Sequence, residues 1–393
     1  PPADVMGSLS GRARLEGVYT EQGVITLRLS GAKGTFVTQT DARGAYTFSE
    51  VPAGSYTLSA TRERYFPLTL ADVEVRPETT LKPLILRNHR ELVTLGGVYD
   101  PRRLEVAEDP EFGGTVPTRS PFLTNLVLSP DGKRLGFIQG GAVRSVRLDG
   151  SDARTEKPLP AGMQADWLDW GQRGFLLRTW TGTASASITL LGDPGAETLV
   201  ASGQDEHFAP VFAPDEQQIA FVRYEPQTRS PQLMRRGLGG GDAPVLLIDL
   251  LDRLNLRGVW DGTYGLMFSP IDWRPEGLMF HAPMTCQLER TGFTLGKDGI
   301  YVLSDPNAPD GALHKAHFYS YYTHAFSHDG TRMLYGYGPE IRSKSLADPI
   351  VTAPGKPVGT HSDEIYASLT PSPDGDRLFY LTPTGIEEMQ LLP

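Results

Sequence analysis

The stretch Leu128-Ser-Pro-Asp-Gly-Lys-Arg-Leu-Gly-Phe-Ile138 decides the fold, because its pattern returns along the chain at 212–222, 326–335 and 371–381. The shared template is a strand, a Ser-Pro-Asp-Gly turn and a second strand. In such a turn proline presets φ, aspartate accepts hydrogen bonds from nearby backbone amides, and glycine takes the left-handed conformation. Each copy therefore predicts a tight hairpin between two buried strands.

The spacing of the copies predicts how many units the chain contains. The turn aspartates stand at positions 131, 215, 329 and 374, so the separations are 84, 114 and 45 residues. The two long separations are double periods, and degenerate copies stand between their ends at 169–177 and 272–280. Six units of about 40 to 57 residues are typical of a β-propeller, whose four-stranded blades close radially and so protect their edges.

The first part of the chain has a different pattern. Residues 10–87 read as short strands with period-two alternation, and turns at 41–44 and 52–54 separate strands that carry aromatic residues. We divide the chain into a tether at 1–9, a sandwich at 10–87, a connector at 88–123 and a propeller at 124–393. Residues 92–95 of the connector are expected to supply the strand that closes the ring. The predicted fold is all-β, a small antiparallel β-sandwich followed by a six-bladed β-propeller.

Both domains resemble known families. The segments Thr40-Asp-Ala-Arg-Gly-Ala-Tyr-Thr-Phe48 and Val51-Pro-Ala-Gly-Ser-Tyr-Thr-Leu58 resemble the signature of the carboxypeptidase regulatory-like family. That resemblance implies a transthyretin-like (prealbumin-like) sandwich, an accessory module of exported proteins. The Ser-Pro-Asp-Gly template resembles the TolB-like propeller repeat, which also occurs in relatives of prolyl oligopeptidase and in oligogalacturonate lyases.

Composition narrows the classes of partner. A net charge of −10 and a pI near 5.4 argue against binding to nucleic acid or to an anionic membrane. Cys286 is the only cysteine, which excludes an intrachain disulfide and a cysteine-based metal site. No apolar run reaches the length of about 18 residues that spans a bilayer. We expect a protein of the cell envelope, either periplasmic, outer-membrane-associated or extracellular, whose signal peptide is removed and whose lipid anchor, if it has one, lies upstream of Pro1.

The candidate binding residues lie where the predicted blades begin. Acidic side chains at these positions are expected to line the channel mouth and to favour a cation or a basic peptide, and two histidines are expected on innermost strands at unequal depth. Imidazole is a common transition-metal ligand, but the spacing does not show convergence, so neither a metal nor a cofactor is assigned. Solvated loop charge and structural histidines are the alternative interpretation. The candidates are Asp166, Glu206, His207, His324, Asp363 and Glu364.

The motifs favour a non-catalytic function. The chain lacks the G-x-S-x-G nucleophile elbow of the hydrolases that carry related propellers, which argues against peptidase activity. The leading hypothesis is a protein-interaction or scaffold protein of the bacterial cell envelope, with the propeller as the platform for an envelope or extracellular protein. The alternatives are a metal-assisted glycan lyase-like enzyme and a carbohydrate-binding wall protein that uses the aromatic run at 318–322.

Overall fold

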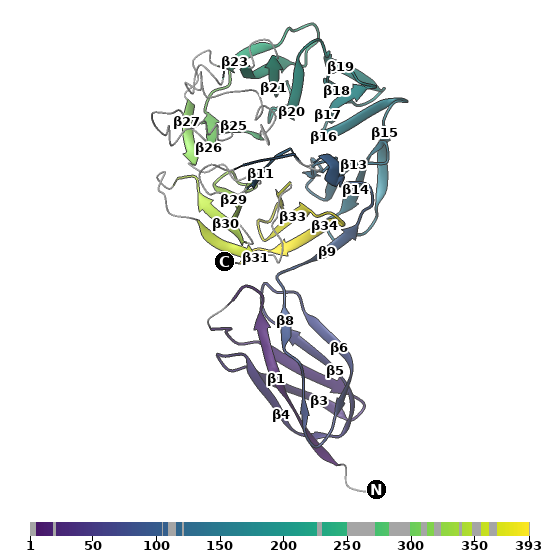
Figure 1. Ribbon diagram of the computed structural model, residues 1–393, viewed down its shortest axis with the longest axis vertical. Helices are drawn as coiled ribbons and strands as arrows, with labels where there is room; N and C mark the ends of the chain where they lie inside the picture. The colour runs from purple at the N-terminus through teal and green to yellow at the C-terminus, as the bar shows by residue number, and fades with distance from the viewer. Residues whose placement is uncertain are drawn as a thin grey trace.

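The computed structural model is all-β and forms two bodies, an elongated sandwich and a ring of blades (Figure 1). It describes residues 5–18, 21–103, 105–108, 115–119, 122–225, 230–249, 272–282, 299–307, 313–317, 324–337, 340–347, 355–360 and 368–392. The predicted fold class is confirmed. Within these ranges, no helix is long and apolar enough to cross a membrane.

The sandwich consists of two four-stranded sheets. The first contains β4 (Ala45–Pro52), β1 (Met6–Leu15), β7 (Thr79–Thr80) and β8 (Leu84–Leu86). The second has the order β3 (Gly34–Gln39), β2 (Thr26–Gly31), β5 (Gly54–Thr61) and β6 (Leu68–Val75). Most neighbours are antiparallel, but the short strands β7 and β8 both pair with β1 in parallel.

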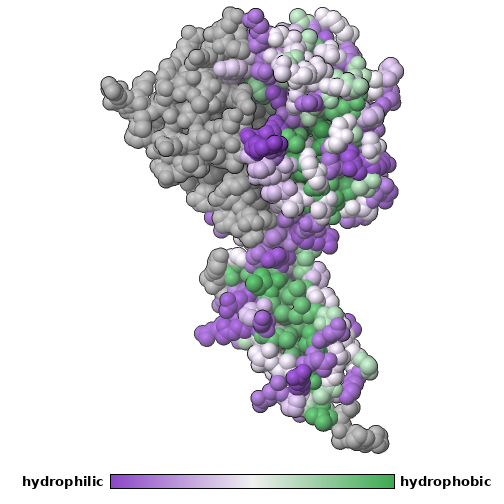
Figure 2. Space-filling view, turned by 45° about the vertical axis from the view of Figure 1, so that its right-hand side comes forward, coloured by the Kyte–Doolittle hydropathy of each residue, from purple (hydrophilic) through white to green (hydrophobic). Residues whose placement is uncertain are grey.

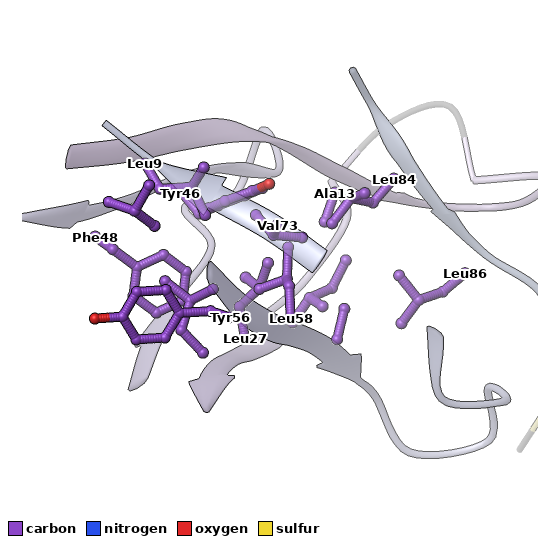
Figure 3. Packing of buried hydrophobic residues seen from close by; sticks show 14 of the residues in the cluster. Leu9, Ala13, Leu27, Tyr46, Phe48, Tyr56, Leu58, Val73, Leu84 and Leu86 are labelled. Carbon is purple, nitrogen blue, oxygen red and sulfur yellow. The ribbon is translucent and has the colours of Figure 1, made fainter. Parts of the chain in front are cut away.

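The core of the sandwich is built from the alternate residues that each strand turns inward. Leu27 on β2 and Leu58 on β5 are almost fully buried and face the residues of the other sheet (Figure 3). Leu29 on β2 is buried in the same cluster. Tyr46 and Phe48 on β4 meet edge to face, with their ring centroids 6.2 Å apart. Period-two alternation in the sequence therefore has the expected cause, which is one buried face per strand.

Among the described residues, six four-stranded sheets form the blades of the ring. Blade 1 contains β12 (Val127–Leu128), β13 (Arg134–Gln139), β14 (Ala142–Arg147) and β15 (Arg154–Pro158). Blade 2 contains β16 (Met163–Gly171), β17 (Gly174–Thr181), β18 (Ser187–Leu191) and β19 (Ala196–Val200). Blade 3 contains β20 (Glu206–Phe212), β21 (Gln218–Glu225), β22 (Ser230–Gly237) and β23 (Val245–Asp249). Blade 4 contains β24 (Asp272–Arg274), β25 (Gly277–Ala282), β26 (Gly299–Leu303) and β27 (Leu313–His317). Blade 5 contains β28 (His324–Phe326), β29 (Arg332–Tyr337), β30 (Glu340–Ser345) and β31 (Lys356–Thr360).

The sixth blade combines the two ends of the propeller sequence. Its strands are β32 (Thr370–Pro371), β33 (Arg377–Leu381), β34 (Gly385–Gln390) and, from the connector, β9 (His89–Thr94). β9 pairs antiparallel with β34, with Val93 opposite Ile386. Between β9 and blade 1 lie the 3-10 turn η1 (Pro101–Arg103) and a separate pair of strands, β10 (Glu105–Glu108) and β11 (Thr115–Arg119).

Hydrophobic clusters fill all six interfaces between neighbouring blades. Each cluster joins inner strands of one blade to those of the next, so blade strands are buried on both faces and read as nearly continuous apolar runs. Representative pairs, from the 1–2 interface round to the 6–1 interface, are Ile138 with Phe175, Leu176 with Phe221, Val222 with Leu278, Met279 with Phe326, Leu334 with Leu378, and Phe379 with Leu135.

The Ser-Pro-Asp-Gly turns have the predicted local structure. In blade 1, Ser129 Oγ donates a hydrogen bond to Asp131 Oδ1 (2.6 Å) and accepts one from Arg134 N (2.9 Å), and Gly132 has a φ of 67°. Blade 3 has Glu216 at the glycine position with a φ of 53°. Its carboxylate accepts hydrogen bonds from Gln172 N (2.7 Å) and Arg173 N (3.1 Å) of blade 2, which offsets the unfavourable backbone conformation.

The two degenerate copies form the expected hairpins, but their aspartates lie elsewhere than in the turn. In blade 2 the hairpin closes between Gly171 and Gly174, and Asp169 is on the inner strand β16, opposite Leu176. In blade 4, Asp272 has the corresponding place on β24, opposite Met279. These two side chains are therefore available to contact the next blade.

Polar contacts hold the sandwich against blade 6, where hydrophilic residues gather at the neck of the molecule (Figure 2). His89 bridges the two bodies, with Nε2 2.8 Å from Glu16 Oε2 of the sandwich and Nδ1 3.3 Å from Glu387 Oε2 of the propeller. Arg64 Nη1 lies 2.6 Å from Asp376 Oδ1, and Leu392 packs against the sandwich core. The first residue of β9 thus contacts both the sandwich and the propeller.

Ring closure leads to a first prediction. A Cβ atom at Gly385 would clash with the backbone oxygen of Val93 on β9, so Gly385→Ala should lower the free energy of unfolding by about 1–3 kcal/mol, the usual cost of overpacking. Chemical denaturation measures this. Gly203→Ala is the control, because nothing lies within 4 Å of its added Cβ. Equal stability of the two variants would contradict the role of this close approach.

Candidate functional site

Arg178 on β17 is the centre of a polar cluster between blades 2 and 3. Its Nη1 atom lies 3.0 and 2.8 Å from the two carboxylate oxygens of Asp166 on β16, and its Nε donates to the backbone oxygen of His207 on β20 (2.7 Å). The guanidinium also lies over the Phe208 ring, 4.7 Å from its centroid. A planar guanidinium that is hydrogen-bonded through two of its nitrogens and stacked on a ring is held in one orientation.

Two more charged residues complete this group, which we call the Arg178 cluster: Arg103, Asp166, Arg178, Glu206 and His207. Arg103 of η1 reaches Asp166 Oδ2 at 3.1 Å, and Glu206 Oε2 lies 3.5 Å from Arg178 Nη2. Asp166 is 12% exposed at its side chain, whereas Arg103 and Glu206 are 35% and 34% exposed. The cluster therefore has a fixed inner ion pair and two outer charges of opposite sign that reach solvent.

His207 is a structural member of the cluster. The residue is 3% exposed, and its Nδ1 lies 2.8 Å from the backbone oxygen of Ala186. Because a carbonyl oxygen only accepts, Nδ1 carries the proton of this hydrogen bond. Burial lowers the pKa of His207 below its ordinary value of 6.5. The ring is therefore held neutral and oriented, in a T-shaped pair with Phe221 at a centroid distance of 5.6 Å.

Asp169 is a second perturbed group, further along β16. Its Oδ2 accepts a hydrogen bond from Phe212 N of blade 3 (2.8 Å), and its Oδ1 accepts one from Trp170 N (2.9 Å). Burial is the main cause that raises its pKa to about 6; the two backbone donors lower the pKa, and the carboxylates of Asp272 and Glu216 raise it. Asp169 links the inner strands of two blades through a carboxylate that is costly to ionise.

The structure brings three of the six sequence candidates together. Asp166, Glu206 and His207 all belong to the Arg178 cluster. His324 begins β28 in blade 5, on the opposite side of the ring from blade 2, where it is buried and forms a T-shaped pair with Phe326. Asp363 and Glu364 lie outside the described residues, as does the aromatic run at 318–322.

The central residue of the cluster was not among those candidates. Arg178 interrupts the apolar strand Phe175-Leu-Leu-Arg178, and a charge inside such a run is a signal of a buried partner. Arg103 carries no such signal, because the connector around it is generally polar. Among the described residues, no three His, Cys, Asp or Glu side chains come together in a way that could hold a metal ion.

Comparisons with known proteins find similarity at the level of solved structures. No family model and no curated protein matches the chain. TolB from Acinetobacter baumannii has a TM-score of 0.42 at 13% identity, over 68% of this chain and 62% of that chain. An oligogalacturonate lyase from Vibrio parahaemolyticus has a TM-score of 0.43 at 10% identity, over 73% and 83%. The β-propeller domain of Myceliophteria thermophila Cps50 (Swd1) has a TM-score of 0.40 at 10% identity, over 78% and 100%. The resemblance of the sandwich to the carboxypeptidase regulatory-like family stays a prediction.

Removing the central guanidinium should destabilise the propeller. In Arg178→Ala, Arg103 is the one cation among the described residues that still contacts Asp166, and the His207 carbonyl loses the hydrogen bond from Arg178. The free energy of unfolding should fall by about 1.5–3 kcal/mol, the usual contribution of a hydrogen bond to a charged group, as measured in urea. Arg102→Ala is the matched control, since Arg102 is 88% exposed and should leave stability unchanged. An Arg178→Ala variant as stable as the wild type would show that the Arg178 cluster does not stabilise the propeller.

Acidification should favour the wild type over Asp169→Asn. The pKa of Asp169 is about 6 in the folded chain and near 3.8 when unfolded, so between these values the folded chain binds a proton that the unfolded chain does not. The wild type should therefore gain about 2 kcal/mol relative to the variant as the pH falls from 7.5 to 4.5. Denaturation curves across that range test the sign. A difference that stays flat or reverses would contradict the raised pKa.

Proposed function

We propose that this chain is a non-catalytic interaction protein of the bacterial cell envelope, and that the propeller face around the Arg178 cluster binds a protein partner. The observation that carries the proposal is that the candidate residues Asp166, Glu206 and His207 are already paired with arginine side chains or backbone groups of the protein. Asp166 is held by two arginines, and His207 by a backbone carbonyl. Such groups are positioned to shape a surface, whereas a general acid or base must present its proton or lone pair to a substrate.

The cluster has the composition of a protein-binding surface. Arg178 is stacked near two aromatic rings, those of Phe208 and Trp180, at 4.7 and 5.6 Å. Arginine and aromatic side chains supply much of the binding energy at protein interfaces, above all when they are already rigid. Arg103 and Glu206 add partly exposed charges of both signs, which steer and orient a partner. The partner is accordingly expected to carry paired acidic and basic side chains.

The location of the protein is part of the proposal. We place it in the periplasm, at the outer membrane or outside the cell, as the family resemblances of its two domains imply. The metal-assisted glycan lyase-like enzyme and the carbohydrate-binding wall protein remain the competing functions, and both predict a small-molecule or glycan ligand where the proposal predicts a protein.

Cross-linking in native cell envelopes tests the function. The wild type should capture one envelope protein in stoichiometric amount, and Glu206→Lys or Arg103→Glu should reduce that capture about tenfold, because each variant reverses one exposed charge at the binding face. The control is Lys133→Glu on the Ser-Pro-Asp-Gly side of blade 1, where Lys133 is 80% exposed. Melting curves verify that all variants are folded.

Two results would contradict the proposal. Equal loss of capture in Lys133→Glu and Glu206→Lys would place binding elsewhere. Glycan turnover by the purified wild type, together with stoichiometric bound metal and no captured protein, would favour the lyase instead.

A further inference from the structure

Most edge strands of the sandwich carry features that prevent pairing with another chain. β6 has a register shift and a left-handed residue, Asp72, with a φ of 54°. β4 ends in Pro52 and contains Glu50, also left-handed with a φ of 54°. β7 has two residues and β8 has three. Bulges, charges, proline and short length are the usual protection of a sheet edge against association.

β3 is an edge strand that lacks these features from its second residue onward; the positive-φ residue Gly34, with a φ of 132°, stands at its start. Its sequence from Gly34 to Gln39 is Gly-Thr-Phe-Val-Thr-Gln, with no charge and no proline. All of its residues pair with β2 in one uninterrupted register. Among the described residues β2 is its single partner strand, since β3 stands at the end of the order β3-β2-β5-β6. Val37, in its middle, is 62% exposed.

The backbone of β3 is oriented to accept a further strand. Thr40 N donates to Ile25 O (3.0 Å), so the pair just beyond β3 is a hydrogen-bonded pair. Antiparallel strands alternate between hydrogen-bonded and non-hydrogen-bonded pairs. Gly34, Phe36 and Thr38 therefore direct their N–H and C=O groups toward β2. Thr35, Val37 and Gln39 direct theirs to the outer edge, at the spacing that an antiparallel partner needs.

We propose that this edge binds β3 of a second copy of the chain, which joins two four-stranded sheets into one continuous sheet around a two-fold axis. Residues directly opposite each other in an antiparallel pair point to the same face of the sheet. One residue must therefore stand opposite its own copy, with the two-fold axis midway between the two. With the axis at Val37, Val37 faces its own copy, Thr35 faces Gln39 of the second copy, and Phe36 faces Thr38. The inference is independent of the proposed function, because β3 belongs to the sandwich.

Charge favours the same chain as the occupant. Every pair in this register is neutral, so self-pairing brings no like charges into opposition, and aromatic with β-branched pairs are among the favourable ones. A two-fold contact also closes on itself and uses each β3 edge once, which stops further growth.

The position of β3 is compatible with two propellers. Its Gly34 end lies near the tip of the sandwich, where Lys33 Nζ donates to Ala53 O (2.9 Å). Its other end leads to Thr40 and Gln22, close to the end of β1 that contacts the propeller. Since the propeller lies at one end of the elongated sandwich (Figure 1), an antiparallel copy would carry its propeller at the opposite end of the joined sheet.

Sedimentation of the full-length chain over a concentration series tests this inference. The wild type should change from monomer to dimer with rising concentration, and Val37→Lys should raise the dissociation constant at least about tenfold, since like charges would stand directly opposite. Ile85→Lys is the matched control, because Ile85 is 51% exposed on the β8 edge and should leave dimerisation intact. Unchanged melting curves exclude unfolding as the cause.

A charge swap tests the register itself. Val37→Glu should also be monomeric, and an equimolar mixture of Val37→Lys and Val37→Glu should recover the dimer, because opposite charges then face each other. A wild type that stays monomeric at every concentration would overturn the proposal. So would a dimer that Val37→Lys leaves intact, or a mixture of the two variants that stays monomeric.

Discussion

The antiparallel pairing of β9 with β34 is the interaction on which the rest of the molecule depends. β9 precedes blades 1 to 5 in the chain, yet it pairs into the last blade. This pairing turns an open row of sheets into a ring. Closure completes the apolar cluster between blades 6 and 1. Because β9 begins with His89, which contacts Glu16 and Glu387, the same strand also fixes the sandwich to the propeller.

Arginine side chains make a second set of connections, between blades and within them. Arg274 of blade 4 donates to the backbone oxygens of Ser327 (2.7 Å) and His328 (2.9 Å) in the turn of blade 5. Arg178 joins blade 2 to blade 3 through the His207 carbonyl. A guanidinium supplies several donors in one plane, so one side chain satisfies carbonyls of a neighbouring turn and a carboxylate of its own blade together. The charged cluster that we propose as a binding face is thus also part of the ring's construction.

The two bodies offer surfaces of different physical character. On the propeller, the exposed charges of Arg103 and Glu206 surround a fixed ion pair and aromatic rings, which suits recognition of another protein through side chains. On the sandwich, β3 offers backbone groups and a neutral strand, which suits pairing with another strand. A chain that self-associates through β3 would present two propeller faces, so weak binding to each partner site would be strengthened by their linkage.

The sequence by itself determined the local structure and the number of repeats. The turn at 129–134 depends on contacts within six residues, and proline, glycine and aspartate impose it wherever they recur. The six blades followed from the recurrence of that turn, the sandwich followed from the period-two alternation of residues 10–87, and Asp166, Glu206 and His207 followed from their place at the starts of blades. Only the tertiary structure decided that Asp169 lies on a strand and that Arg103 and Arg178 meet Asp166. A strand's pattern specifies which side chains are buried, but the residue that each one meets depends on how separate blades pack, which no local pattern encodes.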